Sequence, residues 1–182
     1  MSPKPMRRPN PMRVLMVVCA LALGACASQA PTPPAAAPSA TSATPQQMVA
    51  LIRDAGGDGD GELAVQPLRD PMVDDLRERA VALEAGGDLD AAVAALDQAL
   101  EIVDGDPALL QERAELAVLQ SDFERAGTLA ERGFSLGSQV GPLCRRHWIT
   151  LEQVRLVAGD VDGATSARTQ ADGCRVAGPE RY

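Results

Sequence analysis

The sequence predicts an all-α protein built from stacked helical hairpins, and two observations carry that prediction. The first is a six-residue pattern: a small residue, Asp, an apolar residue, an acidic residue, any residue and a small residue. It occurs at residues 87–92, 34 residues later at 121–126, and 38 residues after that at 159–164. The second is that apolar residues recur at helical spacing on both sides of each pattern. A near-fixed period in this range is typical of repeats that bury their apolar faces only against their neighbours.

Residues 1–25 have the features of a secretory signal. Basic residues precede the apolar run 14–22, which is shorter than the roughly 20 residues that a mature transmembrane helix needs. The following Leu-Gly-Ala-Cys, ending at Cys26, resembles the lipobox of bacterial lipoproteins. The resemblance implies cleavage before Cys26 and its modification by acyl chains such as palmitate, which anchor the protein to a membrane. Because Ala27 and not Asp follows, it also implies the periplasmic side of the bacterial outer membrane; the alternative is a soluble secreted protein cut nearby.

Two segments separate this leader from the repeats. Residues 26–45 contain the modified cysteine and a tether rich in Ala, Pro, Ser and Thr, which we expect to be extended. Residues 46–72 are predicted to hold a short amphipathic helix over 46–55, a Gly/Asp loop and an extended strap. The loop does not fit a calcium-binding EF-hand, because Leu63 and Arg69 stand where that pattern needs Gly and Glu.

The predicted hairpins span residues 73–106, 107–140 and 145–178, and a short tail, 179–182, follows. Large residues at the fourth position and small residues at the eighth and twentieth positions resemble the tetratricopeptide repeat (TPR), a helix–turn–helix unit of about 34 residues. The fourth position holds Leu76, Leu110 and Trp148. The small residues are Ala80 and Ala114 at the eighth position, and Ala92, Ala126 and Ala164 at the twentieth. The third unit departs from the family pattern, with Glu152 at its eighth position. A generic antiparallel helical bundle is the alternative fold.

The charge of the chain limits its partners. The sequence has 17 basic and 25 acidic residues; four of the basic ones lie in the leader, which leaves 13 against 25 and a net charge of −12 after residue 25. Nucleic-acid binding needs a cationic surface, so we expect no nucleic-acid partner.

Cysteine usage points to a disulfide in the third unit. Cys144 precedes its first predicted helix and Cys174 ends its second, and these two ends lie side by side in an antiparallel hairpin. In an oxidising compartment we expect the pair to be bonded; free thiols remain an alternative. A metal site formed with His147 is another, but three ligands are too few for a closed structural zinc site, so we expect no metal and no cofactor.

No catalytic constellation is evident. Ser135 lies in a Gly-x-Ser-x-Gly match, but a nucleophile elbow needs a strand before the serine, and a helix end is predicted here. His147, the only histidine, stands beside two arginines and is predicted to be a surface residue at a helix start.

These observations favour a non-enzymatic adaptor in which the inner groove of the repeats binds an envelope protein or peptide. The resemblance to TPR proteins implies that one face of each first helix lines this groove. Its partner-binding residues would be Arg77, Glu84, Gln111, Glu115, Arg146, Ile149 and Gln153. Two alternatives stay open: the apolar part of the groove packs against residues 46–72, or the protein is a structural lipoprotein that contacts peptidoglycan without a discrete protein partner.

Overall fold

The computed structural model describes residues 38–57 and 70–175, and within these two ranges it contains seven α-helices and no strand. The predicted signal, Cys26, most of the tether, residues 58–69 of the loop and strap, and the tail lie outside the described residues. Among the helices that are described, none has the length and apolar character needed to cross a membrane. The all-α prediction is confirmed.

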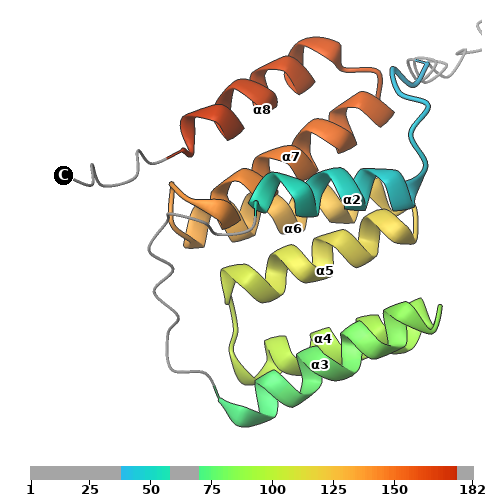
Figure 1. Cartoon of the computed structure of the whole chain (residues 1–182), viewed down its shortest axis with the longest axis vertical. Coiled ribbons are helices and arrows are strands. Elements are labelled where there is room, and N and C mark those ends of the chain that lie inside the picture. Colours follow the sequence, from blue (N-terminus) through green and yellow to red (C-terminus); the bar gives the residue numbers. More distant parts are fainter. Residues whose placement is uncertain (1–37, 58–69, 176–182) are drawn as a thin grey trace, which may run out of the picture. The chain divides into compact units, whose positions relative to one another are not determined.

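Six of the helices form three consecutive hairpins (Figure 1). In each hairpin the two helices pack mainly on each other, and the second helix also packs on the first helix of the next hairpin. This order of contacts is that of a stack of repeats. The helices are α3 (Pro71–Ala85) with α4 (Leu89–Ile102), α5 (Pro107–Leu119) with α6 (Phe123–Leu136), and α7 (Pro142–Val157) with α8 (Val161–Gly173).

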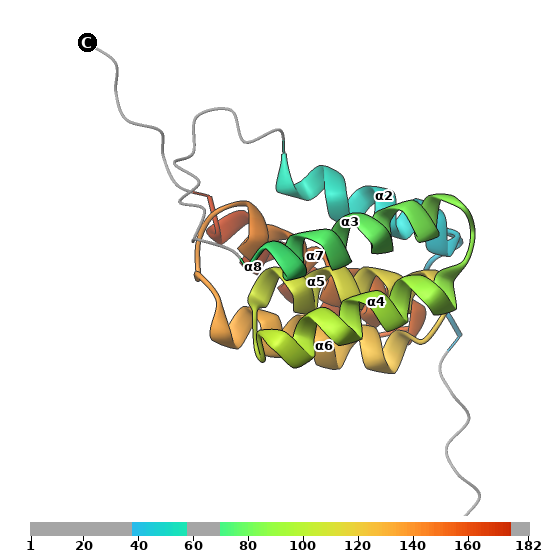
Figure 2. The same cartoon turned by 90° about the horizontal axis from the view of Figure 1, so that it is seen from below.

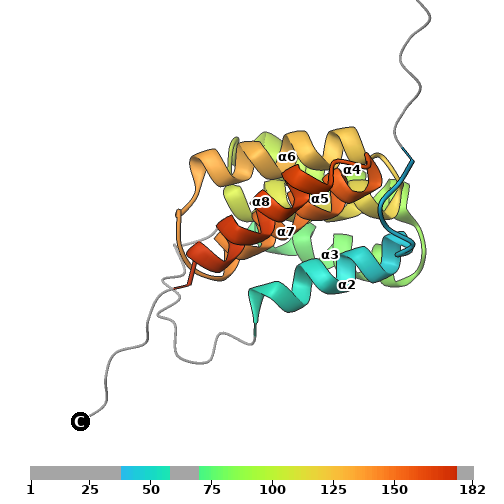
Figure 3. The same cartoon turned by 90° about the horizontal axis from the view of Figure 1, so that it is seen from above.

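The seventh helix, α2 (Pro45–Gly56), precedes the hairpins in the chain and packs on α5 and α7. Figures 2 and 3 show it on the side of the first helices of the repeats, opposite α4 and α6. The predicted helix over 46–55 is therefore present, extended by one residue at each end. It lies against the face where the groove was expected.

The recurring six-residue pattern forms the turn inside each hairpin. Its Asp caps the second helix in all three copies, accepting a hydrogen bond from the backbone N–H three residues later, at N···O distances of 2.9–3.1 Å. The small residue before each Asp has a positive φ: Gly87 at 82°, Ser121 at 60° and Gly159 at 77°. This conformation favours glycine, which explains the small residue at the first position of the pattern.

Small residues let the helices approach closely. The five alanines at the eighth and twentieth positions of the repeats are all buried: Ala80, Ala92, Ala114, Ala126 and Ala164. One apolar cluster lies among α3, α4 and α5, and a second joins α5, α6, α7 and α8. The third cluster lies under α2 and is part of the candidate site.

Two helix starts differ from the expected unit boundaries. The first helix begins at Pro71 and not at residue 73, so Pro71 belongs to the repeat and not to the extended strap. The third hairpin begins at Pro142 and not at residue 145. In both, as in α5, a proline occupies the first turn, where its missing N–H leaves no intrahelical bond unmade.

Candidate functional site

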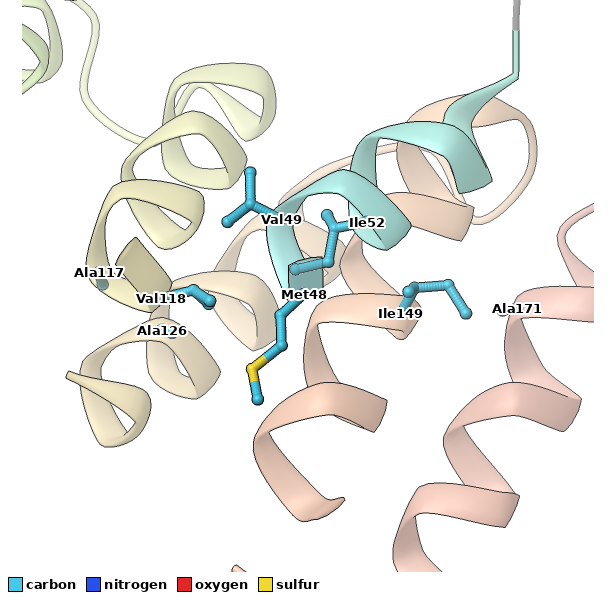
Figure 4. Close-up of a cluster of buried hydrophobic side chains, with 8 residues drawn as sticks. All are labelled: Met48, Val49, Ile52, Ala117, Val118, Ala126, Ile149 and Ala171. Atoms are coloured by element: carbon cyan, nitrogen blue, oxygen red, sulfur yellow. The ribbon is translucent and has the colours of Figure 1, made fainter. Parts of the chain in front are cut away.

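The candidate site is the layer formed by α3, α5 and α7 together with α2, which covers part of it. Met48, Val49 and Ile52 of α2 are buried. They pack with Val118 of α5 and Ile149 of α7, and Figure 4 shows α2 lying between these two residues. We call this contact region the α2 seat. This packing agrees in part with the alternative that the apolar part of the groove packs against residues 46–72. Val118 packs against the chain's own helix 45–56, and Leu119 and Val157 lie at the edge of the same cluster.

Charged groups hold α2 beside this apolar contact. Arg53 donates from both terminal nitrogens to the carboxylate of Glu84 on α3, each at 2.9 Å, and from Nε to Glu115 on α5 at 2.8 Å. Burial by itself lowers the pKa of Arg53, but the hydrogen bonds to Glu84 and Glu115 outweigh it, so the net shift is upward. Arg53 therefore stays charged and ties α2 to two successive repeats.

The same Glu115 carboxylate also binds α7. Its side chain is fully buried, and its second oxygen accepts from Gln111 at 2.9 Å and from Arg146 Nε at 3.0 Å. Gln111 donates in turn to the hydroxyl of Thr150 at 2.9 Å. A buried carboxylate is costly unless it is paired and hydrogen-bonded, and here two arginines and one amide satisfy it.

The carboxyl end of α2 is held by a further arginine. Arg145 Nε donates to the carbonyl of Ala55 at 2.8 Å, and one terminal nitrogen donates to the carbonyl of Gly56 at 3.0 Å. A cation at this end of a helix also interacts favourably with the helix dipole. Upstream of the helix, the N–H of Ala40 donates to the carbonyl of Leu156 at 2.8 Å.

Beside the α2 seat, the first repeat is open. A cleft of about 290 Å³ is lined by residues of α2, α3, α4, α5 and α7. Its apolar lining is Ala80, Val81, Ala85, Leu96 and Leu116, and its charged lining is Arg53, Arg77, Glu84, Glu112, Glu115 and Arg146. A second hollow of about 420 Å³ shares Arg77, Val81 and Glu112 with it. We call the two together the α3 cleft. Val81 is 66% exposed there, although it is an apolar residue.

Arg77 is fixed within this cleft. It binds both oxygens of Glu112 and lies 3.9 Å from a carboxylate oxygen of Asp74. The hydrogen bond to Glu112 raises the pKa of Arg77 despite its partial burial. The α3 cleft is therefore a surface of paired charges with an apolar residue at its edge.

The structure divides the seven residues that were predicted to line a partner-binding groove. Arg77 and Glu84 line the α3 cleft, and Arg146 lies partly buried between the cleft and the seat. Gln111, Glu115, Ile149 and Gln153 are buried. Glu115 forms part of the cleft wall, but all four side chains are at most 3% exposed, so their role in partner binding stays a prediction.

Two arginines of this site, Arg53 and Arg145, were missed by the sequence analysis. A signal for Arg53 was present. An amphipathic helix over 46–55 must bury its apolar stripe, and Arg53 lies next to that stripe because it directly follows Ile52. For Arg145 the sequence offered only a basic pair at a helix start.

Two residues considered for chemistry occupy structural positions. The prediction that His147 is a surface residue is wrong: it is fully buried, packed against Gly133 of α6, and its Nδ1 lies 2.7 Å from the amide oxygen of Gln111. Burial, reinforced by the charge of Arg146, lowers the pKa of His147 to about 4, so it is neutral at pH 7. Ser135 lies near the end of α6 and donates to the carbonyl of Arg132 at 2.8 Å. Its surroundings are not those of a nucleophile elbow.

The predicted disulfide is present. Cys144 and Cys174 are bonded, with Cα atoms 5.8 Å apart, and the N–H of Gly141 donates to the carbonyl of Cys174. Both sulfurs are therefore unavailable as thiolate ligands. Within residues 38–57 and 70–175, no group of three or more His, Cys, Asp or Glu side chains is arranged to hold a metal ion.

The fold and the site define an all-α domain of stacked helical hairpins with a partly covered inner face. A solved structure described as the globular C-terminal domain of P. aeruginosa LpoP matches it at 31% sequence identity and a TM-score of 0.54, covering 58% of this chain and 99% of that one. At this identity over the whole LpoP domain, the chain belongs to the family of that domain. No family model matches the chain, so the resemblance to the TPR rests on the repeat architecture and is not supported by a TPR family match. A search of curated proteins also found no match.

Proposed function

We propose that this protein is a non-enzymatic adaptor that is lipid-anchored through Cys26 on the periplasmic side of the outer membrane and binds an envelope protein through the α3 cleft. The observation that carries the proposal is that cleft. It lies on the inner face of the repeat stack, has paired charges, and leaves an apolar residue, Val81, exposed at its edge. Protein-binding surfaces combine such apolar contacts with paired charges. The lipobox-like sequence ending at Cys26 supports an envelope location, and the chain shares its fold with the globular C-terminal domain of P. aeruginosa LpoP.

The charge of the chain supports a protein partner over a nucleic acid. The chain after residue 25 carries a net charge of −12. On α3 itself, the exposed Asp75 and Glu78 lie near the partly buried Asp74. These carboxylates would repel a phosphate backbone and favour a partner with basic side chains around an apolar contact.

Photo-crosslinking in cells tests the cleft directly. A photoreactive amino acid replaces Val81 in one chain and Val161 in another. Val161 is a matched control, because it is also an exposed valine, at 54%, but begins α8 outside the cleft. We expect a discrete protein adduct from position 81 and a much weaker one from position 161. Equal adducts from both positions, or only glycan-linked product, would contradict the adaptor function; the second result would support a structural wall-associated lipoprotein.

Surface variants test the same cleft without disturbing the fold. Replacing Gln111 or Arg146 would break the buried network around Glu115, so such variants would confuse binding with stability. Val81→Asp and Glu78→Arg change exposed side chains of the cleft lining only. In a pull-down, we expect the full chain with both changes to recover at least tenfold less of the partner protein that the crosslinking identified. Its thermal unfolding should stay unchanged.

The anchor is tested separately at Cys26. A Cys26→Ser chain should leave the membrane fraction, and the mass increase expected for acyl chains should be absent from it. If that chain sediments with membranes as completely as the wild type, the lipid anchor is wrong, whatever the crosslinking shows.

A further inference from the structure

We propose that the α2 seat on α5 and α7 is itself a binding site for an amphipathic helix, and that α2 is its resident ligand. A partner helix with apolar residues at positions i, i+1 and i+4 and an arginine at i+5 would occupy the seat by displacing α2. The pattern is that of Met48, Val49, Ile52 and Arg53. This inference deepens the proposed function, on which the existence of a partner rests, by naming the kind of partner.

The contacts of α2 are those of a helix bound in a groove. Among the described helices its backbone comes close only to α5 and α7, although α3 follows it in the chain, and its contact with α3 is the Arg53–Glu84 ion pair. One stripe of apolar side chains enters the seat, while Leu51 on the other side of the helix is 48% exposed. Such a stripe, with anchors one helical turn apart, is how grooves recognise amphipathic helices.

The helix also carries its own folding signals. Thr44 and Gln47 form a reciprocal capping box: the Thr44 hydroxyl accepts from the Gln47 N–H at 3.3 Å, and the Gln47 side chain accepts from the Thr44 N–H at 2.9 Å. Pro45 begins the first turn. Because these signals are local, residues 44–47 themselves specify where the helix begins.

The floor of the seat differs from the apolar cores between the hairpins. Glu115 and Arg146 lie beside the Met48–Ile52 contact, and Glu115 is buried with α2 in place. These charged groups become hydrated when the helix leaves, so uncovering them costs less than uncovering an apolar core. This polar and apolar mixture resembles an interface between two proteins.

The arginine in the motif is specified by geometry. Glu84 accepts hydrogen bonds from both terminal nitrogens of Arg53, and Glu115 accepts one from its Nε. One guanidinium therefore donates three hydrogen bonds to carboxylates of two repeats. A lysine ammonium cannot reproduce this fork. A competing helix therefore needs Arg and not merely a positive charge.

A synthetic peptide of residues 43–57, labelled with a fluorophore, is the probe, and full-length chains are the receptors. Ile52→Asp empties the seat by placing a carboxylate in its apolar contact, whereas Leu51→Asp changes the neighbouring exposed residue and is the matched control. We expect the Ile52→Asp chain to bind the peptide at least tenfold more tightly than the wild-type and Leu51→Asp chains, because tethered α2 competes there at high effective concentration. An Arg53→Lys peptide should bind the Ile52→Asp chain at least tenfold more weakly than the native peptide.

Several results would overturn the inference. One is a folded Ile52→Asp chain that does not bind the peptide, and another is equal binding by all three chains. If Ile52→Asp does not fold, hydrogen exchange of the wild-type chain decides: α2 amides that exchange only as slowly as those of α5 would make α2 a fixed part of the core. Faster exchange of α2 supports displacement.

A wild-type dimer that exchanges α2 between copies would assign the seat to a second copy and refute a partner helix. Peptide binding without a protein adduct at Val81 in cells would support the seat while refuting the adaptor function.

Discussion

Two glycines of α6 provide a test of the packing that holds the candidate site in place. A Cβ built on Gly133 would lie 2.5 Å from Cε1 of His147 and 3.1 Å from its Nδ1, whereas a Cβ on Gly127 meets only Val154, at 3.5 Å. The first distance is a clash and the second is an ordinary contact. Gly133→Ala must therefore displace His147, and Gly127→Ala need displace nothing.

The expected change in stability follows from opposing terms. Alanine favours the helix over glycine by about 0.8–1 kcal/mol at either position. At Gly133 this gain opposes overpacking of about 1–3 kcal/mol and the loss of the hydrogen bond between His147 and Gln111, about 1 kcal/mol. We expect Gly133→Ala to lower the free energy of unfolding by about 1–3 kcal/mol, and Gly127→Ala to raise it by up to about 1 kcal/mol.

Urea denaturation followed by circular dichroism measures both variants against the wild type. The slope of the free energy with urea should stay constant, so that the shift in midpoint reports stability alone. If Gly133→Ala is as stable as Gly127→Ala, His147 does not pack on α6 as described, and the buried His147–Gln111 contact under the site is wrong.

Three further measurements address other parts of the molecule. Ser121 has a φ of 60°, where Gly stands at the equivalent places of the other two repeats, so Ser121→Gly should stabilise the chain by about 0.5–1 kcal/mol in thermal unfolding; a loss of stability would contradict the turn geometry. The pKa of His147 is about 4 in the fold and near 6.5 when unfolded, so the unfolded chain binds the proton first as the pH falls. The free energy of unfolding should decrease by up to about 3 kcal/mol between pH 6.5 and pH 4, and a His147→Gln chain should show no such decrease above pH 5. Changing Cys144 and Cys174 to Ser opens a loop with a sequence separation of 30 and should cost about 3–4 kcal/mol in urea denaturation; a cost below about 1 kcal/mol would rule out that stabilising effect.

The hairpins could be predicted because their signals are local. Each turn pattern contains the capping Asp and the small residue with positive φ that its geometry requires, and the alanines that the family pattern marks are the ones that the fold buries. The disulfide followed from the same reasoning, since the ends of an antiparallel hairpin must meet.

The site was harder to predict because its contacts join distant parts of the chain. Nothing local to residues 45–56 indicates which repeats their apolar stripe covers. The sequence therefore left open whether the groove is free or packs against residues 46–72, and in the structure α2 fills part of it. His147 stands beside two arginines, which suggested a surface position. Its burial depends on Gly133, in the helix before it, which leaves room for the ring. A glycine inside a helix is a signal of such close packing, but one sequence does not say what packs there.

The prolines that begin α5 and α7 also decide how the hairpins stay separate. Only a few residues join α4 to α5 and α6 to α7. A short connection of this kind can become helical, so that the two flanking helices form one long helix and the hairpins are swapped with those of a second copy. Pro107 and Pro142 oppose that outcome, because a proline within a helix interior costs about 3 kcal/mol and disfavours helical geometry in the residue before it. Each connection is thereby kept bent, which disfavours exchange of hairpins between neighbouring copies.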